Sequence, residues 1–174
     1  RVRDLLPTTL GGERRGAFEV LLLTRWRPEA YEVDRSVGPR FPVSRLRLCR
    51  ETCLDVVALH AARPLRDRGV WRSAQLALAA RLAAERKGPA ILVGDLNLTP
   101  WSPAFSRLVD TSSLRDSALG RGVVPTWLSA IPFIGLTIDH VLVSPDIGVR
   151  ARRVGPDVGS DHFPVTAELV LPAE

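Results

Sequence analysis

The sequence lacks any apolar run long enough to cross a bilayer, which takes about 20 residues. The best candidate, residues 74–84, is interrupted by Gln75 and Arg81. No signal-peptide hydrophobic region follows the polar start at residues 1–4. We therefore expect no membrane-spanning segment in this chain. Any targeting or anchoring segment would lie outside it, so the compartment stays open.

Internal repeats are also absent from the 174 residues, which favours one domain over residues 1–174. A chain of this length can bury a sizeable core. Hydrophobic residues make up 45% of the sequence and charged residues 25%, which are the proportions of an ordinary globular protein. We expect a single globular domain and a monomer.

Cysteine and lysine are scarce. The two cysteines, Cys49 and Cys53, have no second cysteine pair and no histidine nearby, which argues against a zinc site. A tight turn over residues 50–52 would allow a disulfide between them, and two free thiols fit the spacing equally well. Lys87 is the only lysine, so the net charge of +5 comes from arginines. These are scattered, and charge alone does not indicate nucleic-acid binding.

Apolar runs and alternating patterns predict a protein with more strands than helices. We expect a loop over residues 1–16 and a buried strand over 17–24. Strands over 43–49 and 54–60 should be neighbours of that strand in one sheet. The remaining strands are expected at 90–93, 137–143, 149–154 and 163–171.

Two segments have helical patterns. Residues 71–87 are rich in Ala and Leu, which favour helix, and Gly88 and Pro89 follow them as an end signal. A second helix is expected over 103–109, with Ser102 as its N-cap. Helices mixed with strands indicate an α/β or α+β protein with packed layers.

Polar residues follow the buried strand at 90–93, in the sequence Gly94-Asp95-Leu96-Asn97. If the chain stays extended there, Asp95 and Asn97 point to the same side. A carboxylate can hold a divalent cation or a water, and an amide can donate to a phosphate oxygen. Taken alone the motif is weak evidence, because an Asp-Asn turn after a strand is common.

A more specific motif, GSDHFPV at residues 159–165, precedes the last expected strand. The imidazole of His162 can take a proton from water at physiological pH. Asp161 beside it can bind a metal ion or a water held by a phosphate. Adjacent acid and imidazole side chains before a strand point to hydrolytic chemistry.

Two further histidines lie in or after apolar strands. Asp139, in the strand at 137–143, needs a partner, because a buried carboxylate without one is costly. A histidine is a natural partner, since the carboxylate can orient its ring. Adjacent strand residues face opposite sides, so if Asp139 faces a site, His140 is structural or lies at the rim. His60 closes the strand at 54–60, where a surface or capping role is the simplest interpretation.

Together these segments resemble the endonuclease/exonuclease/phosphatase superfamily, which includes apurinic endonucleases, pancreatic-type deoxyribonuclease, neutral sphingomyelinases and inositol polyphosphate phosphatases. The sequence LLLTR at 21–25 is similar to the family's strand ending in Ser-Arg, and His60 matches a strand-ending histidine. The resemblance spans residues 17–171 and implies a four-layer α-β-β-α sandwich. The motifs in the family's order are GDLN at 94–97, IDHV at 138–141 and GSDHFPV at 159–165.

The resemblance also implies a role for each site residue. His162 matches the general base that activates the attacking water, and Asp139 the carboxylate that orients it. Asp95 and Asn97 match the pair that positions the nucleophile and stabilises the phosphoryl oxygens. His60 matches the histidine that stabilises charge or protonates the leaving oxygen. The implied ligands of Mg²⁺ or Mn²⁺ are Asp95, Asn97 and Asp161.

One family feature has no match in the sequence. Members begin with a strand bearing an Asn and a segment bearing a metal-binding Glu, both before the strand that here starts at Ala17. Only 16 residues precede Ala17, and their glutamate, Glu13, lies in a Gly/Arg-rich context unlike the family's. We therefore expect an N-terminally truncated sandwich that binds its metal weakly.

The function expected first is a divalent-metal-dependent phosphodiesterase or nuclease-like hydrolase, with a phosphoester substrate and nucleic acid among the candidates. One alternative is a phosphomonoesterase acting on a nucleotide- or inositol-like substrate. Another is a non-catalytic binding domain that has lost its metal glutamate. The completeness of the remaining site residues favours an enzyme. Trp101 and Trp127 could stack on a base, but packing in the core or at a rim is the simpler interpretation.

Overall fold

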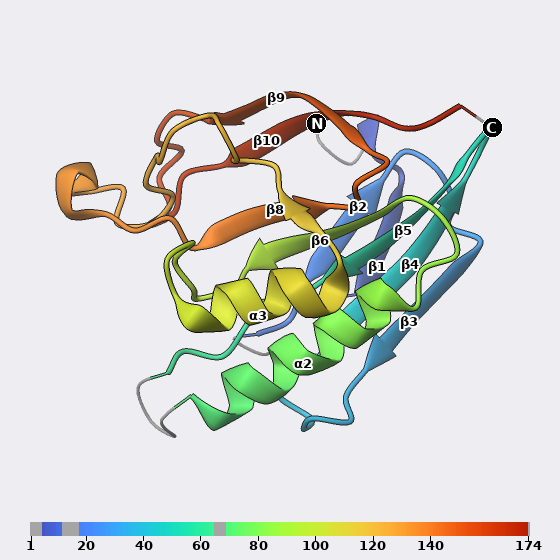
Figure 1. The fold of residues 1–174 in the computed structure, drawn as a ribbon, viewed down its shortest axis with the longest axis horizontal. Coiled ribbons are helices and arrows are strands. Elements are labelled where there is room, and N and C mark those ends of the chain that lie inside the picture. Colours follow the sequence, from blue (N-terminus) through green and yellow to red (C-terminus); the bar gives the residue numbers. More distant parts are fainter. Residues whose placement is uncertain (1–4, 12–17, 65–68, 174) are drawn as a thin grey trace.

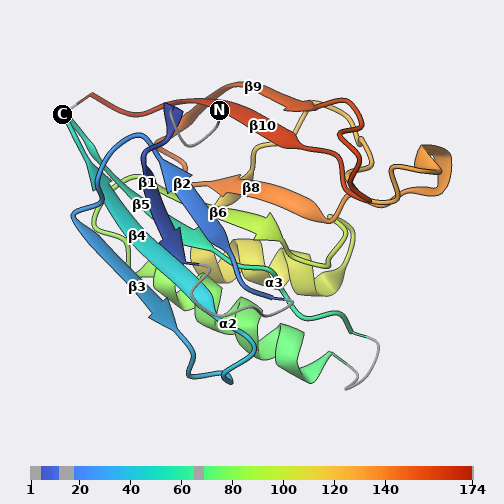
Figure 2. The same cartoon turned by 180° about the vertical axis from the view of Figure 1, so that it is seen from behind.

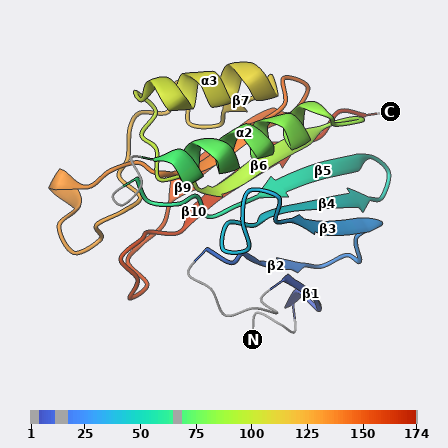
Figure 3. The same cartoon turned by 90° about the horizontal axis from the view of Figure 1, so that it is seen from below.

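The structure, a computed structural model, describes residues 5–11, 18–64 and 69–173. A central sheet carries two helices on one face and two β-hairpins on the other (Figures 1, 2 and 3). The predicted α/β (α+β) class is confirmed. Helices, sheet and hairpins are three of the layers expected for the α-β-β-α sandwich, and within the described ranges both helices lie on the same side of the sheet.

Six strands form the central sheet, in the order β3-β4-β5-β6-β8-β7. Within it β5 and β6 run parallel, and the other neighbours are antiparallel. Parallel neighbours require a crossover connection, which is why a helix lies between β5 and β6 in the chain. The strands are β3 (Ala30–Asp34), β4 (Val43–Cys49), β5 (Cys53–Ala58), β6 (Ala90–Asp95), β7 (Arg115–Asp116) and β8 (Asp139–Val143).

The two helices confirm the helical predictions, with shifted ends. The crossover helix α2 (Val70–Ala84) buries Leu76, Leu78 and Leu82 in the hydrophobic core. The helix α3 (Pro103–Ser112) begins where predicted, with the Ser102 hydroxyl accepting a hydrogen bond from the Phe105 N–H at 3.2 Å. A single 3-10 turn, η1, follows later in the chain (Pro132–Ile134). In the part of the chain that the structure describes, no helix has the length and apolar character to cross a membrane.

The face opposite the helices is covered by two hairpins. β1 (Thr8–Gly11) pairs with β2 (Leu21–Thr24), and β9 (Gly148–Val154) pairs with β10 (Val165–Val170). The expectation of loop over residues 1–16 is wrong for β1, which is too short and polar to show alternation and is a strand because β2 pairs with it. The expectation that β2 adjoins β4 and β5 is also wrong, because β2 lies in a separate sheet.

Other strand boundaries differ from the predictions in ways that matter for the site. The edge strand β3 was not predicted; its charged sequence AYEVD becomes a strand by pairing with β4. β5 ends at Ala58, so His60 lies just beyond the strand. β6 continues to Asp95 and β8 begins at Asp139, so both aspartates belong to the paired ends of their strands.

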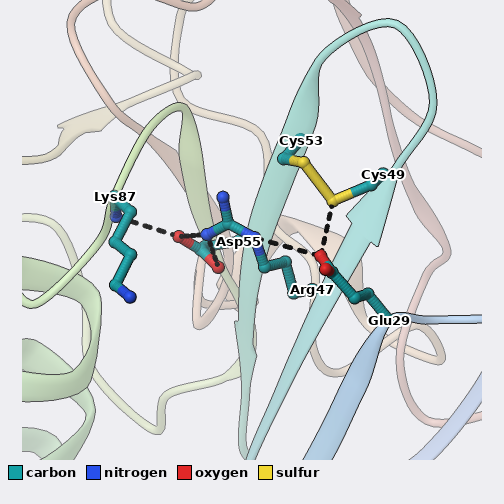
Figure 4. The surroundings of a disulfide bond; sticks show 6 residues. All are labelled: Glu29, Arg47, Cys49, Cys53, Asp55 and Lys87. Carbon is teal, nitrogen blue, oxygen red and sulfur yellow. Dashed lines mark hydrogen bonds and ion pairs between the residues drawn. A yellow bond between two sulfur atoms is a disulfide. The ribbon is translucent and has the colours of Figure 1, made fainter.

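The far end of the β4–β5 hairpin is closed by a disulfide between Cys49 and Cys53, which face each other in register (Figure 4). The two free thiols that the sequence left open are therefore excluded, and the sulfurs are not available as metal ligands. Beside the disulfide, the Arg47 guanidinium donates to both oxygens of the buried Asp55 carboxylate at 3.1 Å. Asp55 also accepts from the backbone N–H of Lys87 at 3.1 Å, which ties the end of the α2 connection to β5.

We predict that a Cys49→Ser/Cys53→Ser variant loses about 2 kcal/mol of stability, the entropic value for closing so short a loop. Its activity should equal that of the wild type, because the disulfide lies at the end of β5 away from His60. Thermal unfolding with and without reductant measures this. Reduction should lower the wild-type Tm to that of the variant and leave the variant's Tm unchanged; equal Tm values in all four samples would contradict it.

Candidate active site

Two carboxylates face each other across neighbouring strands. In the antiparallel pairing of β6 and β8, Asp95 is opposite Asp139. This register follows from the apolar residues on either side, since Leu92 pairs with Leu142 and both are fully buried. A shift by one residue would turn these leucines out of the core, so core packing fixes the carboxylates beside each other.

His162 reaches this pair from the loop before β10. Its Nδ1 lies 2.8 Å from Oδ2 of Asp139, which is the contact predicted from the sequence. Because the carboxylate faces Nδ1, the proton of the neutral ring belongs on Nδ1 and the lone pair on Nε2. That Nε2 lies 3.9 Å from Oδ2 of Asp95. The ring is therefore held with its basic nitrogen toward the second carboxylate.

The Asp139–His162 pair is supported by the segment around Thr126. The Thr126 hydroxyl accepts hydrogen bonds from the backbone N–H groups of Ile138 and Asp139 at 3.0 and 3.1 Å. The backbone of Trp127 forms a bridge with His162. Thr126 is fully buried, which makes its hydroxyl a fixed part of the site. A sequence signal for it is weak, because a single threonine in an apolar segment has many explanations.

His60 comes to the same carboxylate from the other side. Its Nε2 lies 3.4 Å from Oδ2 of Asp95, and its ring packs against the Phe18 ring in a T-shaped contact. The helix α2 positions this segment through Gln75, whose amide oxygen accepts from the Ala62 N–H at 2.8 Å. Gln75 is fully buried and also donates to the carbonyl of His60 at 3.3 Å. A polar residue in the apolar face of a helix is the signal that sequence reasoning missed.

Asn97 closes the site below Asp95. Its backbone has φ 48°, a left-handed conformation that asparagine tolerates better than most residues. Its N–H donates to Asp95 Oδ1 at 2.9 Å, and its side-chain NH₂ donates to the Ala61 carbonyl at 2.8 Å and to Asp95 Oδ2 at 3.3 Å. Since both amide hydrogens have acceptors, the amide oxygen is the atom that Asn97 can offer to a ligand.

Burial dominates the electrostatics of the site. It raises the pKa of Asp95, and the neighbouring Asp139 adds to this, while the Asn97 N–H and the two histidines oppose it. Burial lowers the pKa of His60, with Asp95 acting in the opposite direction and Arg63 and His162 in the same direction. His60 is therefore neutral near pH 7. The negative charge on Asp95 destabilises the folded protein, because burial disfavours it.

Position 94 of the GDLN motif has to be a glycine for a steric reason. Gly94 has φ 143°, and a Cβ there would lie 1.8 Å from the carbonyl oxygen of Leu59. The absence of a side chain lets the chain after β5 stay against β6, where the Ala61 N–H donates to the Asp95 carbonyl at 2.8 Å. The close approach brings His60 to Asp95.

His140 points away from the site, as strand alternation predicts. It is 2% exposed, its Nε2 lies 2.9 Å from the Leu98 carbonyl and its Nδ1 lies 3.6 Å from Asp116. Burial alone would raise the pKa of Asp116, but the neighbouring His140 ring and the hydrogen bond from the Ala118 N–H lower it overall. The structural interpretation of His140 holds, and Asp116 lies on the opposite side of β8 from Asp139.

Asp161 is separate from the cluster of Asp95, Asp139 and His162. Its side chain is exposed, and its backbone carbonyl accepts hydrogen bonds from the N–H groups of Leu128 and Ser129. Its role as a metal ligand stays a prediction. Glu13, the other acidic residue considered for the metal, lies outside the described residues.

The donors needed for a divalent cation are present in the cluster itself. One ligand atom each from Asp95, Asp139 and His162 lies within 4.8 Å of the others. Carboxylate oxygens are the protein ligands that Mg²⁺ and Mn²⁺ prefer. A cation would also offset the buried charge that raises the pKa of Asp95. Asp139 and His162 are hydrogen-bonded to each other, so Asp95 is the carboxylate of the cluster that is open to such an ion. Asp95 also belongs to the metal-binding set predicted from the sequence.

A pocket of about 280 Å³ opens onto Asp95, Asn97 and His162. Its lining combines polar residues, among them the exposed Arg63, with apolar ones, among them the half-buried Trp127. Arg63 was not singled out from the sequence, because it is one of many scattered arginines. The pocket is lined by Arg63, Pro64, Asp95, Asn97, Thr99, Trp127, Leu136, Ile138 and His162.

A mixed sheet ending in a carboxylate–histidine pair, with a second carboxylate and histidine beside it, is the arrangement of a hydrolase site. The chain belongs to the endonuclease/exonuclease/phosphatase family, whose family model matches residues 3–162. It is thus a phosphoesterase-like hydrolase by family. A search of curated proteins finds no match.

Solved structures share the fold at low sequence identity. An endonuclease/exonuclease/phosphatase from Bacteroides vulgatus has a TM-score of 0.80 and 20% identity, over 98% of this chain and 79% of that one. A mannosyl-6-phosphatase from Bacteroides thetaiotaomicron has a TM-score of 0.72 and 20% identity, over 97% and 79%. TDP2 from D. rerio, complexed with a single-strand DNA product, has a TM-score of 0.75 and 14% identity, over 94% and 76%.

The pKa of Asp95 predicts the sign of a stability change. A folded-state pKa above the unfolded value means that Asp95 favours folding at low pH and that this contribution is lost as pH rises through the folded pKa. Asp95→Asn should therefore raise the Tm of metal-free protein at neutral pH and have less effect in acid. Thermal unfolding in the presence of chelator, at several pH values, measures this.

Asp116→Asn is the matched control on the other side of β8. Its pKa is lowered in the folded state, so its charge stabilises the protein above the unfolded pKa and this contribution is lost as pH falls through the folded pKa. This variant should lower the Tm at neutral pH. Two variants that shift the Tm in the same direction at neutral pH would contradict the electrostatic account.

Proposed function

We propose that the protein is a divalent-metal-dependent phosphodiesterase in which His162 is the general base. The observation that supports this most directly is the placement of the His162 ring, with Nδ1 on Asp139 and Nε2 3.9 Å from Asp95. That spacing is too long for a direct hydrogen bond and suits a water held between the two groups. Such a water would be both positioned and within reach of a base.

In the proposed reaction, Nε2 of His162 takes a proton from the water as its oxygen attacks phosphorus. The bond from phosphorus to the leaving ester oxygen breaks, and that oxygen takes its proton from solvent in the open pocket. Asp139 keeps the ring in the tautomer with a free Nε2 and stabilises the imidazolium that forms. Asp95 orients the water through its Oδ2. We assign His60 a hydrogen-bonding role toward Asp95 and the phosphoryl charge, because its lowered pKa does not suit it to protonating the leaving oxygen near pH 7.

The metal would be held by Asp95 and by the amide oxygen of Asn97, with Mg²⁺ or Mn²⁺ as the ion. When bound, it would neutralise negative charge on the phosphoryl oxygens. Mg²⁺ keeps several waters and takes one or two carboxylates from a protein. This is consistent with a site that has one carboxylate committed to His162 and a second, Asp95, directed at the pocket.

The charge in the pocket favours a phosphodiester over a phosphomonoester. Among the described residues that line it, Arg63 is the one cationic side chain. A monoester carries about −1.5 to −2 charge at pH 7, as a phosphorylated side chain does, whereas a diester carries a single charge. The apolar wall formed by Trp127, Leu136 and Ile138 would accept the second ester group. Nucleic acid stays among the candidate substrates, since Trp127 can stack on a base.

We predict that His162→Ala lowers phosphodiester hydrolysis by roughly a hundred- to ten-thousand-fold, the usual cost of removing a general base. Asp139→Asn should also lower the rate, and the double variant should be scarcely slower than His162→Ala, because coupled groups are not additive. Initial rates with Mg²⁺ on a panel of diesters and monoesters measure this. If the two losses multiply, Asp139 serves something other than His162. Wild-type rates in His162→Ala would overturn His162 as the general base, and absence of hydrolysis by the wild type would favour the binding-domain alternative.

We also predict weak Mg²⁺ binding that depends on Asp95. Calorimetry should show that Asp95→Asn removes the binding measured for the wild type. Asp161→Asn decides between two expectations: the resemblance implies a loss of affinity, whereas the exposed position of Asp161 implies none. Tight stoichiometric binding that survives Asp95→Asn would place the ion elsewhere in the chain.

A further inference from the structure

A segment without any charge protrudes beside the pocket. Residues 122–138 contain no Asp, Glu, Lys, Arg or His, although a quarter of the whole sequence is charged. Within them, the apolar tip, defined here as residues 128–136, extends away from the body of the molecule (Figure 1, orange). Phe133 is 87% exposed and Ile134 59%. Exposed apolar clusters of this kind mark interaction sites rather than ordinary surface.

Part of the backbone of the apolar tip is hydrogen-bonded within the tip itself. The N–H groups of Ile131, Ile134 and Gly135 donate to carbonyls within the tip, at 2.9, 3.2 and 3.1 Å. Pro132 has no N–H to satisfy. In hydrocarbon an unpaired backbone group is costly because no water can pair with it.

The tip is also fixed to the active site. At its base, the N–H groups of Leu128 and Ser129 donate to the carbonyl of Asp161, and the Ser129 hydroxyl donates to the carbonyl of Ser160. Leu136, its last residue, lines the catalytic pocket. Whatever the tip contacts is therefore held at a set position relative to His162, two residues after Ser160.

We propose that the apolar tip inserts into the surface of a lipid bilayer and holds the pocket against it. A stable protein interface takes about 20–30 residues a side, with a polar rim. The tip is a narrow projection of nine residues with neither the breadth nor the rim. A bilayer accepts a small apolar projection, and the net charge of +5 favours an anionic surface.

The docking itself needs no catalysis. Its consequence for the substrate rests on the proposed function: the phosphodiester hydrolysed would be one presented at the membrane surface. Its phosphate would enter the pocket at Arg63, and its apolar part would lie along Trp127 and Leu136 toward the tip.

Sedimentation with vesicles tests the docking. The probes are vesicles of phosphatidylcholine alone and of phosphatidylcholine mixed equally with phosphatidylglycerol. The wild type should bind both, and the mixed vesicles more tightly. In Phe133→Ser/Ile134→Ser, affinity for both should fall on the order of tenfold for each side chain removed. Val170→Ser, a partly exposed apolar residue at the end of β10, is the matched control and should bind as the wild type does.

Each outcome decides one question. Wild type that does not bind vesicles, or a tip variant that binds them as well as wild type, overturns the docking. A wild type that forms dimers which the tip variant loses, measured by light scattering, would make the tip a protein interface instead. Hydrolysis of a water-soluble diester with Mg²⁺ is followed in parallel and should be equal in wild type and tip variant. Vesicle binding without hydrolysis would reject the proposed function and keep the docking.

Discussion

The site depends on the antiparallel pairing that sets Asp95 opposite Asp139. Two carboxylates at paired positions repel each other, and burial makes the charge on Asp95 more costly still. The neighbouring groups all act to relieve this: the Asn97 N–H on one oxygen, His60 and His162 near the other, and His162 on Asp139. The buried leucines of the core hold the register of β6 and β8. Apolar packing therefore keeps the two carboxylates beside each other in spite of their repulsion.

The two faces of β8 each carry an acid–imidazole pair, one at the pocket and one buried. On one face Asp139 orients the half-buried His162 at the pocket, and on the other Asp116 and the Leu98 carbonyl hold the buried His140. Both are acid–imidazole pairs, and they are distinguished by access to solvent. The inner pair fixes the chain just after Asn97, so the position of the Asn97 backbone depends on a histidine that never meets a ligand.

The sequence predicted the parts of the fold that short-range patterns determine. The Ala/Leu-rich helix, the Ser102 cap and the apolar strand before Gly94 all have local causes, and the structure has them. β1 and β3 were missed because partner strands, rather than their own residues, make them strands. In the site, Asp95, Asn97, Asp139, His60 and His162 were found through motifs. Gln75, Arg63 and Thr126 were not, because their positions matter only once α2, the pocket and the loops are assembled.

Gly94 shows how a motif of the candidate site can contain a residue with no chemistry of its own. Its missing side chain allows the carbonyl of Leu59 to lie against β6, and that contact determines where His60 comes to rest. The motif thus supplies a carboxylate and an amide, and its glycine also sets how closely the chain after β5 approaches β6. Transplanting the site to another scaffold would require moving the ends of β5 and β6 as one unit, since grafted side chains alone would lose the spacing.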